Sequence, residues 1–361
     1  MARKVLGAAA VAVAVGSLSV VGVGPVAPAA GASAAERAGD RAAQWRAGAP
    51  MPEGRAEMGV AALDGRVYVV GGTVQRGDDA PEFTTTLVTS YDPRADRWSQ
   101  HAPLPRPLTH VGVAVLDGKL YAFGGFTDIV HLDPQQAAFV YDPRNDIWTG
   151  LPDMPRKLGS VGVAAAGGKL HLIGGRDSRT VVTVPGTQPP VSQGFGTVRT
   201  HLVYDPARQS WTQALPLPVE PRDHLGIAVL GDSIHVFGGR VADVADNLAR
   251  HDVYDTLTRR WTSAAPLPTP RSAGAAAVVD GRIVFAGGEC KSAGGADPTG
   301  TYDDVTAYSP RTDRWSTLPA LPQGRHAFGA ARIGDRAYFV GGALTCGGGA
   351  STDTLELTLA E

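Results

Sequence analysis

The chain has 361 residues, with 33 basic and 35 acidic side chains, and 43% of its residues are hydrophobic. This length and apolar content are enough for a sizeable core. The near-neutral charge provides no electrostatic footprint for nucleic acid or for an anionic membrane, so neither is expected as a partner. Two cysteines exclude a disulfide-rich scaffold and a cysteine-rich zinc site.

The N-terminus has the pattern of a secretory signal. Arg3 and Lys4 precede an apolar stretch at residues 5–23, and Ala32-Ser33-Ala34 has the small-x-small form of a cleavage site. We therefore expect residues 1–34 to be a signal peptide and residues 35–361 to form a secreted, extracellular domain with no stable membrane association. The alternative is an uncleaved anchor, because the apolar stretch approaches the length of a membrane span.

A double glycine closes a short apolar run six times along the chain. The runs are VYVVGG (67–72), LYAFGG (120–125), LHLIGG (170–175), IHVFGG (234–239), IVFAGG (283–288) and AYFVGG (337–342). A tryptophan stands 26 or 27 residues before the first glycine of each pair, and a tyrosine precedes five of the six tryptophans by seven positions. This regular spacing predicts a repeat protein.

Each double-glycine run follows a strand of small residues. The fifth position of that strand is always alanine, at Ala61, Ala114, Ala164, Ala228, Ala277 and Ala331. Because side chains alternate along a strand, the glycine or alanine two positions earlier lies on the same face. This pattern predicts the innermost strand of each repeat, where strands crowd around a common axis. Pairs such as Asp64-Gly65 then predict a tight hairpin to the double-glycine strand.

The tyrosine and the tryptophan of each repeat mark a third and an outer fourth strand. We expect their rings to pack between neighbouring sheets, the alternative being that they bind sugars. Trp45 has no tyrosine seven places before it, and the strand at residues 353–359 has no following partner. The segment around Trp45 is therefore expected to complete the last sheet, which gives six closed sheets.

The repeat resembles the kelch repeat, whose units are the four-stranded blades of a β-propeller. The pattern covers residues 45 to about 360, and the resemblance implies an all-β, six-bladed kelch β-propeller with its last blade closed by the N-terminal strand. Kelch propellers include protein-interaction modules, the copper enzyme galactose oxidase and the periplasmic sialic acid mutarotases. The extra domains and copper ligands of galactose oxidase have no match here, and neither do the site residues of the mutarotases.

The loops entering the inner strands are the first candidate site. Each repeat has an arginine there, and three of these arginines have a histidine close behind: Arg55, Arg106 with His110, Arg156, Arg222 with His224, Arg271, and Arg325 with His326. A ring of guanidinium groups at the mouth of a propeller can bind an anionic group bidentately. The alternative is that these arginines are structural and bond to loop carbonyls. Glu289, after the fifth double glycine, is a further candidate for binding or proton transfer.

Two smaller patterns occur beside the arginines. Cys290 and Cys346 fall on equivalent loops of adjacent repeats, so either a disulfide or two free thiols is expected. Asp243, Asn247 and His251 resemble the iron-ligand spacing of the plant specifier proteins, with Asp in place of Glu and Asn in place of Asp. The neutral middle residue favours an ordinary polar loop, and no metal or other cofactor is expected.

Two functions follow from these patterns. The first is a monomeric, secreted binding or interaction module that holds a protein or glycan partner, including an anionic one, on its Arg-rich loop face. The alternative is an enzyme of the sialic acid mutarotase or epimerase type, in which an arginine anchors a carboxylate and His224, His326 or Glu289 moves a proton. A concave pocket that combines an unpaired arginine with an acid or a histidine would favour the enzyme.

Overall fold

The computed structural model describes residues 43–75, 81–129, 131–182, 191–241, 246–291 and 300–359. The chain divides into two units, residues 1–39 and residues 40–361, and all described residues belong to the second unit. The expected signal peptide and Asp243 lie outside the described residues. No helix that could span a membrane occurs in the described part of the chain.

The described residues contain six four-stranded antiparallel sheets. Three of them come from the first half of the chain: β3 (Gly59–Leu63), β4 (Arg66–Val70), β7 (Val88–Asp92) and β8 (Arg97–Gln100); β9 (Gly112–Leu116), β10 (Lys119–Phe123), β11 (Ala138–Asp142) and β12 (Ile147–Gly150); β13 (Gly162–Ala166), β14 (Lys169–Ile173), β17 (His201–Asp205) and β18 (Ser210–Gln213).

The other three sheets follow in the second half: β19 (Gly226–Leu230), β20 (Ser233–Phe237), β21 (His251–Asp255) and β22 (Arg260–Ser263); β23 (Ala275–Val279), β24 (Arg282–Gly288), β25 (Tyr302–Ser309) and β26 (Arg314–Leu318); β27 (Gly329–Ile333), β28 (Arg336–Val340), β29 (Thr354–Thr358) and β1 (Gln44–Ala47). Two smaller sheets occur in the loops of the first and third repeats. One consists of β2 (Arg55–Ala56), β5 (Thr73–Val74) and β6 (Phe83–Thr84), and the other of β15 (Arg176–Val182) and β16 (Val191–Thr197).

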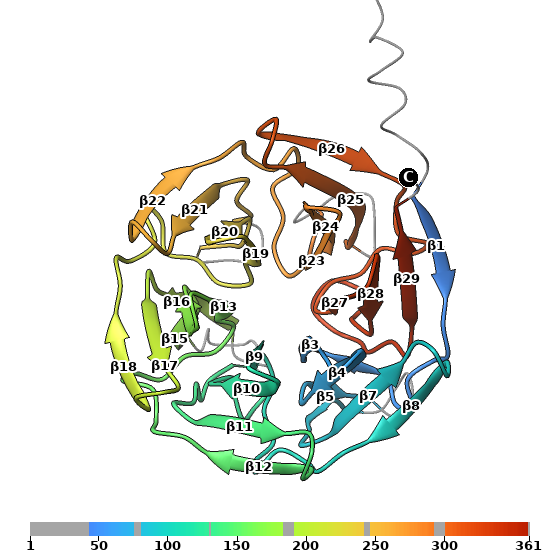
Figure 1. Cartoon of the computed structure of the whole chain (residues 1–361), viewed down its shortest axis with the longest axis horizontal. Coiled ribbons are helices and arrows are strands. Elements are labelled where there is room, and N and C mark those ends of the chain that lie inside the picture. The colour runs from blue at the N-terminus through green and yellow to red at the C-terminus, as the bar shows by residue number, and fades with distance from the viewer. Residues whose placement is uncertain are drawn as a thin grey trace, which may run out of the picture. The chain divides into compact units, whose positions relative to one another are not determined.

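The six sheets stand in a ring around a common axis (Figure 1). The inner strands β3, β9, β13, β19, β23 and β27 each contact the next, and β27 contacts β3. Small residues are needed where these strands meet, because a Cβ on Gly112 would lie 2.5 Å from Val163 of the neighbouring strand. The all-β propeller expected from the spacing of glycine and alanine is therefore confirmed.

Tyrosine and tryptophan join neighbouring sheets, as expected. Tyr141 is fully buried and donates its hydroxyl hydrogen to Asp146 at 2.7 Å, and Asp146 also accepts the backbone N–H of Ala102 at 2.8 Å. The indole N–H of Trp148 donates to the carbonyl oxygen of Ala102 at 3.0 Å. The other five indole groups make the equivalent bond to a carbonyl on another repeat, which makes these rings part of the packing between sheets.

The two ends of the chain meet in one sheet. Strand β1 pairs antiparallel with β29, with Trp45 opposite Leu357. The Trp45 ring lies edge-on to Phe339 of β28, with 5.3 Å between ring centroids. The N-terminal strand thus supplies the outer strand of the sheet that also contains the C-terminal strand (Figure 1).

Candidate functional site at the axial mouth

Backbone hydrogen bonds link the loops entering the inner strands around the axis. One residue per repeat has a positive φ and stands two positions before the inner strand: Glu57, His110, Ser160, His224, Ala273 and Ala327. The N–H of His110 donates to the carbonyl of Glu57 at 2.7 Å, and Glu57 in turn donates to Ala327 at 2.8 Å. We call these six residues the axial ring, because they surround one mouth of the propeller.

A second residue from each repeat lies beside the axial ring. It directly follows the double glycine: Thr73, Phe126, Arg176, Arg240, Glu289 or Ala343. The backbone of Arg240 pairs with Asp223, the residue before His224, and Arg176 pairs in the same way with Gly159. The residue that follows each double glycine therefore lies at the axial mouth. In the third, fourth and fifth repeats its side chain is charged.

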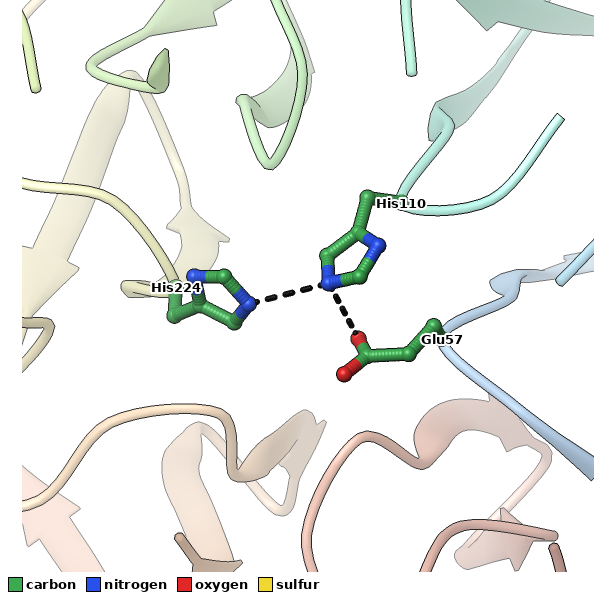
Figure 2. A group of neighbouring side chains, drawn as sticks. All are labelled: Glu57, His110 and His224. Carbon is green, nitrogen blue, oxygen red and sulfur yellow. Dashed lines mark hydrogen bonds and ion pairs between the residues drawn. The ribbon is translucent and has the colours of Figure 1, made fainter. Parts of the chain in front are cut away.

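Glu57, His110 and His224 converge on the axis from three different repeats (Figure 2). Oε2 of Glu57 lies 2.7 Å from Nε2 of His110, and this nitrogen lies 3.1 Å from Nε2 of His224. The two histidine side chains are 3% and 4% exposed, and the Glu57 side chain is 19% exposed. The three polar atoms form a compact group in which Glu57 is the most exposed member.

Neighbouring groups hold the far side of both imidazole rings. Nδ1 of His110 lies 3.1 Å from Oγ1 of Thr109, whose hydroxyl donates to the carbonyl of Glu57 at 3.3 Å. Nδ1 of His224 lies 3.2 Å from Oδ1 of the buried Asp223. These contacts fix both rings so that their Nε2 atoms face each other.

Two buried arginines and two carboxylates surround the histidines. Asp223 accepts from Nε of Arg176 at 2.6 Å, and its other oxygen lies 3.6 Å from Nε of Arg240. Arg240 also pairs with Glu289 and donates to Nε2 of His224 at 3.3 Å. His326 donates from Nε2 to the carbonyl of Thr345 at 2.8 Å, and its Nδ1 lies 4.0 Å from Glu289. The mouth is thus a network of paired charges.

This network shifts the pKa values of its members. Burial would raise the pKa of Glu57, but the charge and hydrogen bond of His110 outweigh it and hold that pKa well below its usual range. Burial, reinforced by the nearby Arg240 charge, lowers the pKa of His224 to about 4. Burial would also raise the pKa of Glu289, yet the Arg240 guanidinium keeps it below its usual range. Glu57 and Glu289 are therefore carboxylates at neutral pH.

Cavities lie on both sides of the axial ring. One of about 140 Å³ is lined by the axial ring residues and by the residues that follow them, directly before the inner strands. The other, of about 70 Å³, is lined by the ionisable side chains of Glu57, Glu82, His131, Arg240, Glu289 and His326. Ile129, which is 40% exposed, and the exposed Gly347 also line the second cavity, so it reaches the protein surface. Glu57 lines both cavities.

The structure brings together four of the residues expected from the sequence and separates the others from them. His110, His224, Glu289 and His326 meet at the axial mouth. Arg222, Arg271 and Arg325 are instead buried within their sheets, and each donates from Nη1 to the carbonyl of the first glycine in its own double glycine, at 3.2, 3.0 and 3.0 Å.

The remaining repeat arginines are also outside the mouth. Arg55 is buried and bonds to the carbonyls of Val69 and Leu87, and burial lowers its pKa to about 10. Arg106 is exposed and donates to Gln135 at 2.9 Å, whereas Arg156 pairs with Asp177. Four of these arginines, Arg55, Arg222, Arg271 and Arg325, thus bond to backbone carbonyls within the sheets, which is the structural alternative expected for them.

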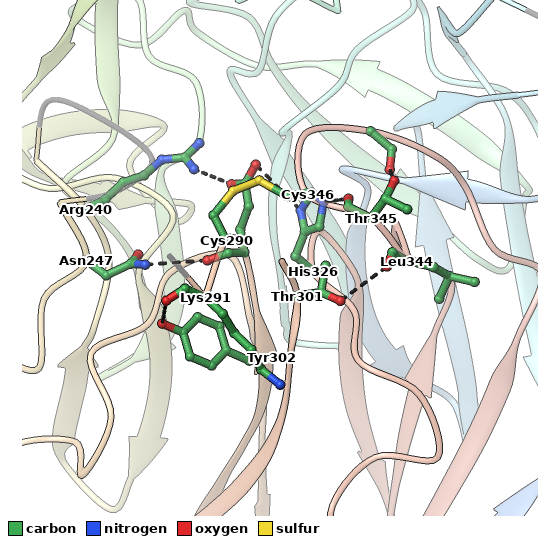
Figure 3. The surroundings of a disulfide bond; sticks show 12 residues. Arg240, Asn247, Cys290, Lys291, Thr301, Tyr302, His326, Leu344, Thr345 and Cys346 are labelled. Atoms are coloured by element: carbon green, nitrogen blue, oxygen red, sulfur yellow. Dashed lines mark hydrogen bonds and ion pairs between the residues drawn. A yellow bond between two sulfur atoms is a disulfide. The ribbon is translucent and has the colours of Figure 1, made fainter. Parts of the chain in front are cut away.

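The two cysteines are joined in a disulfide beside the mouth (Figure 3). Cys290 directly follows Glu289, and its Cα lies 5.2 Å from that of Cys346 in the next repeat. Asn247 donates to the carbonyl of Glu289 at a distance of 3.5 Å, and His251 lies within β21, where it bonds to His235. Asn247 and His251 thus take part in ordinary loop and core contacts.

Besides Glu82, His131 and Asp223, the sequence reasoning missed three residues of the mouth: Glu57, Arg176 and Arg240. A positional signal for them exists in the sequence, because both arginines directly follow a double glycine and Glu57 stands two places before Gly59. Reading the same two positions across all repeats would have found them. The arginine of the repeat drew attention instead because it recurs, whereas these residues differ from one repeat to the next.

A ring of four-stranded sheets with polar loops at one axial mouth defines a β-propeller with a candidate ligand site. The KLHDC2/KLHL20/DRC7 Kelch-repeats domain matches residues 154–342, and the Kelch motif matches residues 54–105 and 107–155. The chain belongs to the kelch-repeat family.

Relatives with kelch repeats support this assignment. The chain is similar to Kelch-like protein terF of Aspergillus terreus, with 30% identity over 308 residues that cover 81% of this chain and 62% of that protein. It is also similar to Beta-scruin of Limulus polyphemus, with 37% identity over 84 residues, which are 23% of this chain and 9% of Beta-scruin. The chain thus spans less than two thirds of the length of these relatives.

Among solved structures, the one titled "Structure of YjhT" matches with a TM-score of 0.68 and 19% identity, covering 86% of this chain and 97% of that chain. At this identity the likeness shows the fold alone.

Proposed function

We propose that this kelch propeller is an extracellular binding module that takes a polar group of a glycan or protein partner into the cavity at its axial mouth. One observation supports this proposal above all. Six ionisable side chains from five of the six repeats line a single cavity that reaches the surface. Rigid strands position these groups while variable loops surround them, which is the usual arrangement of a binding site on a repeat scaffold.

The charges at the cavity favour a neutral, hydroxyl-rich group over an anion. Three carboxylates line it, from Glu57, Glu82 and Glu289, against the single guanidinium of Arg240. That guanidinium already pairs with Glu289, and the carboxylate of Asp223 lies close to it. Fixed carboxylates and imidazoles suit sugar hydroxyl groups, which both donate and accept hydrogen bonds.

Glycan-array screening followed by calorimetry tests this function. His326→Asn and Glu82→Gln, both in the cavity wall, are expected to weaken binding of the best ligand at least tenfold. Asp117→Asn is the matched control, because Asp117 lies in the hairpin turn at the opposite end of β9 and its φ of 51° suits asparagine. Binding that survives both cavity variants, or that Asp117→Asn weakens equally, would exclude the axial mouth as the binding site.

A second function has support from one contact. Glu57 and His110 form a hydrogen-bonded acid–base pair at 2.7 Å, which is the kind of group that a mutarotase or epimerase needs. If the chain is such an enzyme, it accelerates anomer exchange of a reducing sugar, measured by NMR exchange spectroscopy, and Glu57→Gln abolishes the acceleration. Binding without any acceleration identifies a binding module.

A further inference from the structure

The three side chains at the centre of the axial ring have the composition of a metal site. Glu57, His110 and His224 each offer one ligand atom, and the three atoms lie within 4.8 Å of one another. We propose that these three residues bind one divalent transition-metal ion, of the Zn²⁺ or Fe²⁺ class, on the axis of the propeller. Two imidazoles and one carboxylate form a ligand set that these ions use in other proteins.

The spacing of the nitrogen atoms fits a shared ion. Metal–nitrogen bonds of about 2.0–2.1 Å place two ligating nitrogens about 3.0 Å apart at a right angle and about 3.4 Å apart in a tetrahedron. The Nε2 atoms of His110 and His224 are 3.1 Å apart. Oε2 of Glu57 lies 2.7 Å from the first of these nitrogens, so a small shift of its flexible side chain is enough to complete the set.

The groups behind the two imidazoles are those that support metal ligands. A histidine that binds a metal through one nitrogen commonly donates its other N–H to a carboxylate, hydroxyl or carbonyl. Nδ1 of His224 faces Asp223 at 3.2 Å, and Asp223 is itself held by Arg176 at 2.6 Å. Nδ1 of His110 faces Thr109 at 3.1 Å. Both Nε2 atoms are therefore directed toward the axis.

The charge of the surroundings also favours a cation. Glu57, Asp223 and Glu289 carry three negative charges, and the buried Arg176 and Arg240 carry two positive charges. One negative charge is thus left over when the histidines are neutral. Arg240 competes for Nε2 of His224, from which it lies 3.3 Å away. It also pairs with Glu289, so it keeps a carboxylate partner when an ion displaces it from that nitrogen.

The frame of the site is rigid, and positions remain open for further ligands. Backbone hydrogen bonds join Glu57 to His110 directly and to His224 through Ala327 and Ala273, so the main chain links all three ligands. Cavities lie on both sides of the axial ring, and Glu57 lines both. Ser160, in the same ring, has a buried Oγ with no hydrogen-bond partner among the described residues. This hydroxyl is available to a water molecule on the ion.

The other cluster of potential ligand residues in the described part of the chain does not qualify. It consists of Glu289, Cys290 and Cys346. Its two sulfur atoms are bonded to each other in the disulfide, so neither is a thiolate ligand.

Zinc titration of the untagged full chain tests the proposal. The protein is stripped with a chelator and titrated with Zn²⁺ against a chromophoric competitor, and we expect one tight site per chain. Glu57→Gln, His110→Asn and His224→Asn are each expected to weaken zinc binding at least tenfold, because even loss of an outer-shell partner typically costs about 10–100-fold. Mg²⁺ is expected not to compete, because the site is rich in nitrogen ligands.

His326→Asn is the matched control, because His326 is another buried histidine of the same mouth that stands outside the triad. It is expected to leave zinc affinity within about twofold of that of the unchanged chain, although it weakens the proposed glycan binding. The zinc proposal and the glycan proposal can therefore fail independently of each other.

Circular dichroism in the presence of chelator shows which variants fold. The absorption bands of the Co²⁺-loaded unchanged chain, and their loss on adding Zn²⁺, test the site without any variant. Absence of a one-to-one site, its persistence in folded triad variants, or its equal loss in His326→Asn overturns the proposal.

Discussion

Arg271 and Arg106 occupy the same position of the repeat but make different contacts. Arg271 is fully buried and donates to the carbonyls of Gly287 and Asp304 at 3.0 and 2.7 Å and to Thr306 at 2.9 Å. Arg106 is exposed, and Gln135 accepts its one side-chain hydrogen bond between described residues. Recurrence along the sequence therefore identifies an equivalent position in the fold, but it does not predict which contacts the side chain makes there.

The pair provides a direct test of the structural role. Arg271→Met leaves buried acceptors without donors, so we expect the free energy of unfolding to fall by about 3 kcal/mol. Arg106→Met is expected to change it by no more than about 0.5 kcal/mol, because its partner is accessible to water. Urea unfolding of both variants measures this difference. Equal losses would contradict the structural role assigned to the buried arginines.

The third and fourth sheets differ from the others in a pair of buried histidines. His235 and His251 bond to each other at 2.9 Å, and Nδ1 of His251 donates to the carbonyl of Ala265 at 3.1 Å. His171 and His201 repeat this arrangement in the third sheet. Burial lowers the pKa of each of the four histidines to about 4, and at His251 the charge of Asp313 opposes this lowering while that of Arg222 reinforces it.

These pairs predict how stability depends on pH. Histidines in the unfolded chain take up protons near pH 6.5, whereas the buried ones resist protonation until about pH 4. The unfolded chain therefore binds more protons in this window. Stability is fully present above about pH 6.5 and falls as the pH drops toward 4, by at most about 1.4 kcal/mol per pH unit for each histidine.

The double variant His235→Tyr/His251→Ala tests this pH dependence, because it installs the residues of the second sheet, Tyr121 and Ala138, at the equivalent positions. We expect a shallower decline of unfolding free energy between pH 6.5 and pH 4 than in the unchanged chain. Urea titrations at several pH values measure both slopes. Identical slopes would show that these histidines do not remain neutral in the folded chain.

The disulfide links two neighbouring sheets through their loops. Cys290 and Cys346 are 56 residues apart in sequence. Closing a loop of this length stabilises the folded chain by about 4 kcal/mol in the chain-entropy model. We expect Cys290→Ser/Cys346→Ser to lose most of this free energy in urea unfolding under non-reducing conditions. A loss below about 1 kcal/mol would mean that the bond does not constrain the unfolded chain.

The closed ring is a property of the whole molecule, and β1 completes it. A chain that begins at residue 49 lacks this strand and leaves β29 with an open edge. We expect it to melt at a lower temperature and to self-associate, as measured by calorimetry and sedimentation velocity. A chain beginning at Ala35 keeps β1 and serves as the control. Equal melting temperatures and monomeric behaviour of both chains would contradict closure by this strand.

The sequence predicts the propeller well because every structural residue appears in nearly every repeat. Three features recur along the chain and predict the same fold each time: alanine in the inner strand, the double glycine and the Tyr–Trp pair. A single exception, such as Ala275 where the other repeats have glycine, does not hide the pattern. The axial mouth is different. Glu57 is the only glutamate at its repeat position, and arginine follows a double glycine in only two repeats, at Arg176 and Arg240. The proximity of these residues arises only when the ring closes. Periodicity alone could not bring these groups together.

We propose that the chemistry of this molecule lies at the axial mouth and not in the recurring arginines. A crystal structure of the zinc-loaded chain, with anomalous scattering measured at the zinc edge, tests it most directly. We expect one strong peak on the axis, about 2.0–2.2 Å from Nε2 of His110, Nε2 of His224 and a carboxylate oxygen of Glu57. A mouth without a peak, or a peak bound by other residues, would contradict it.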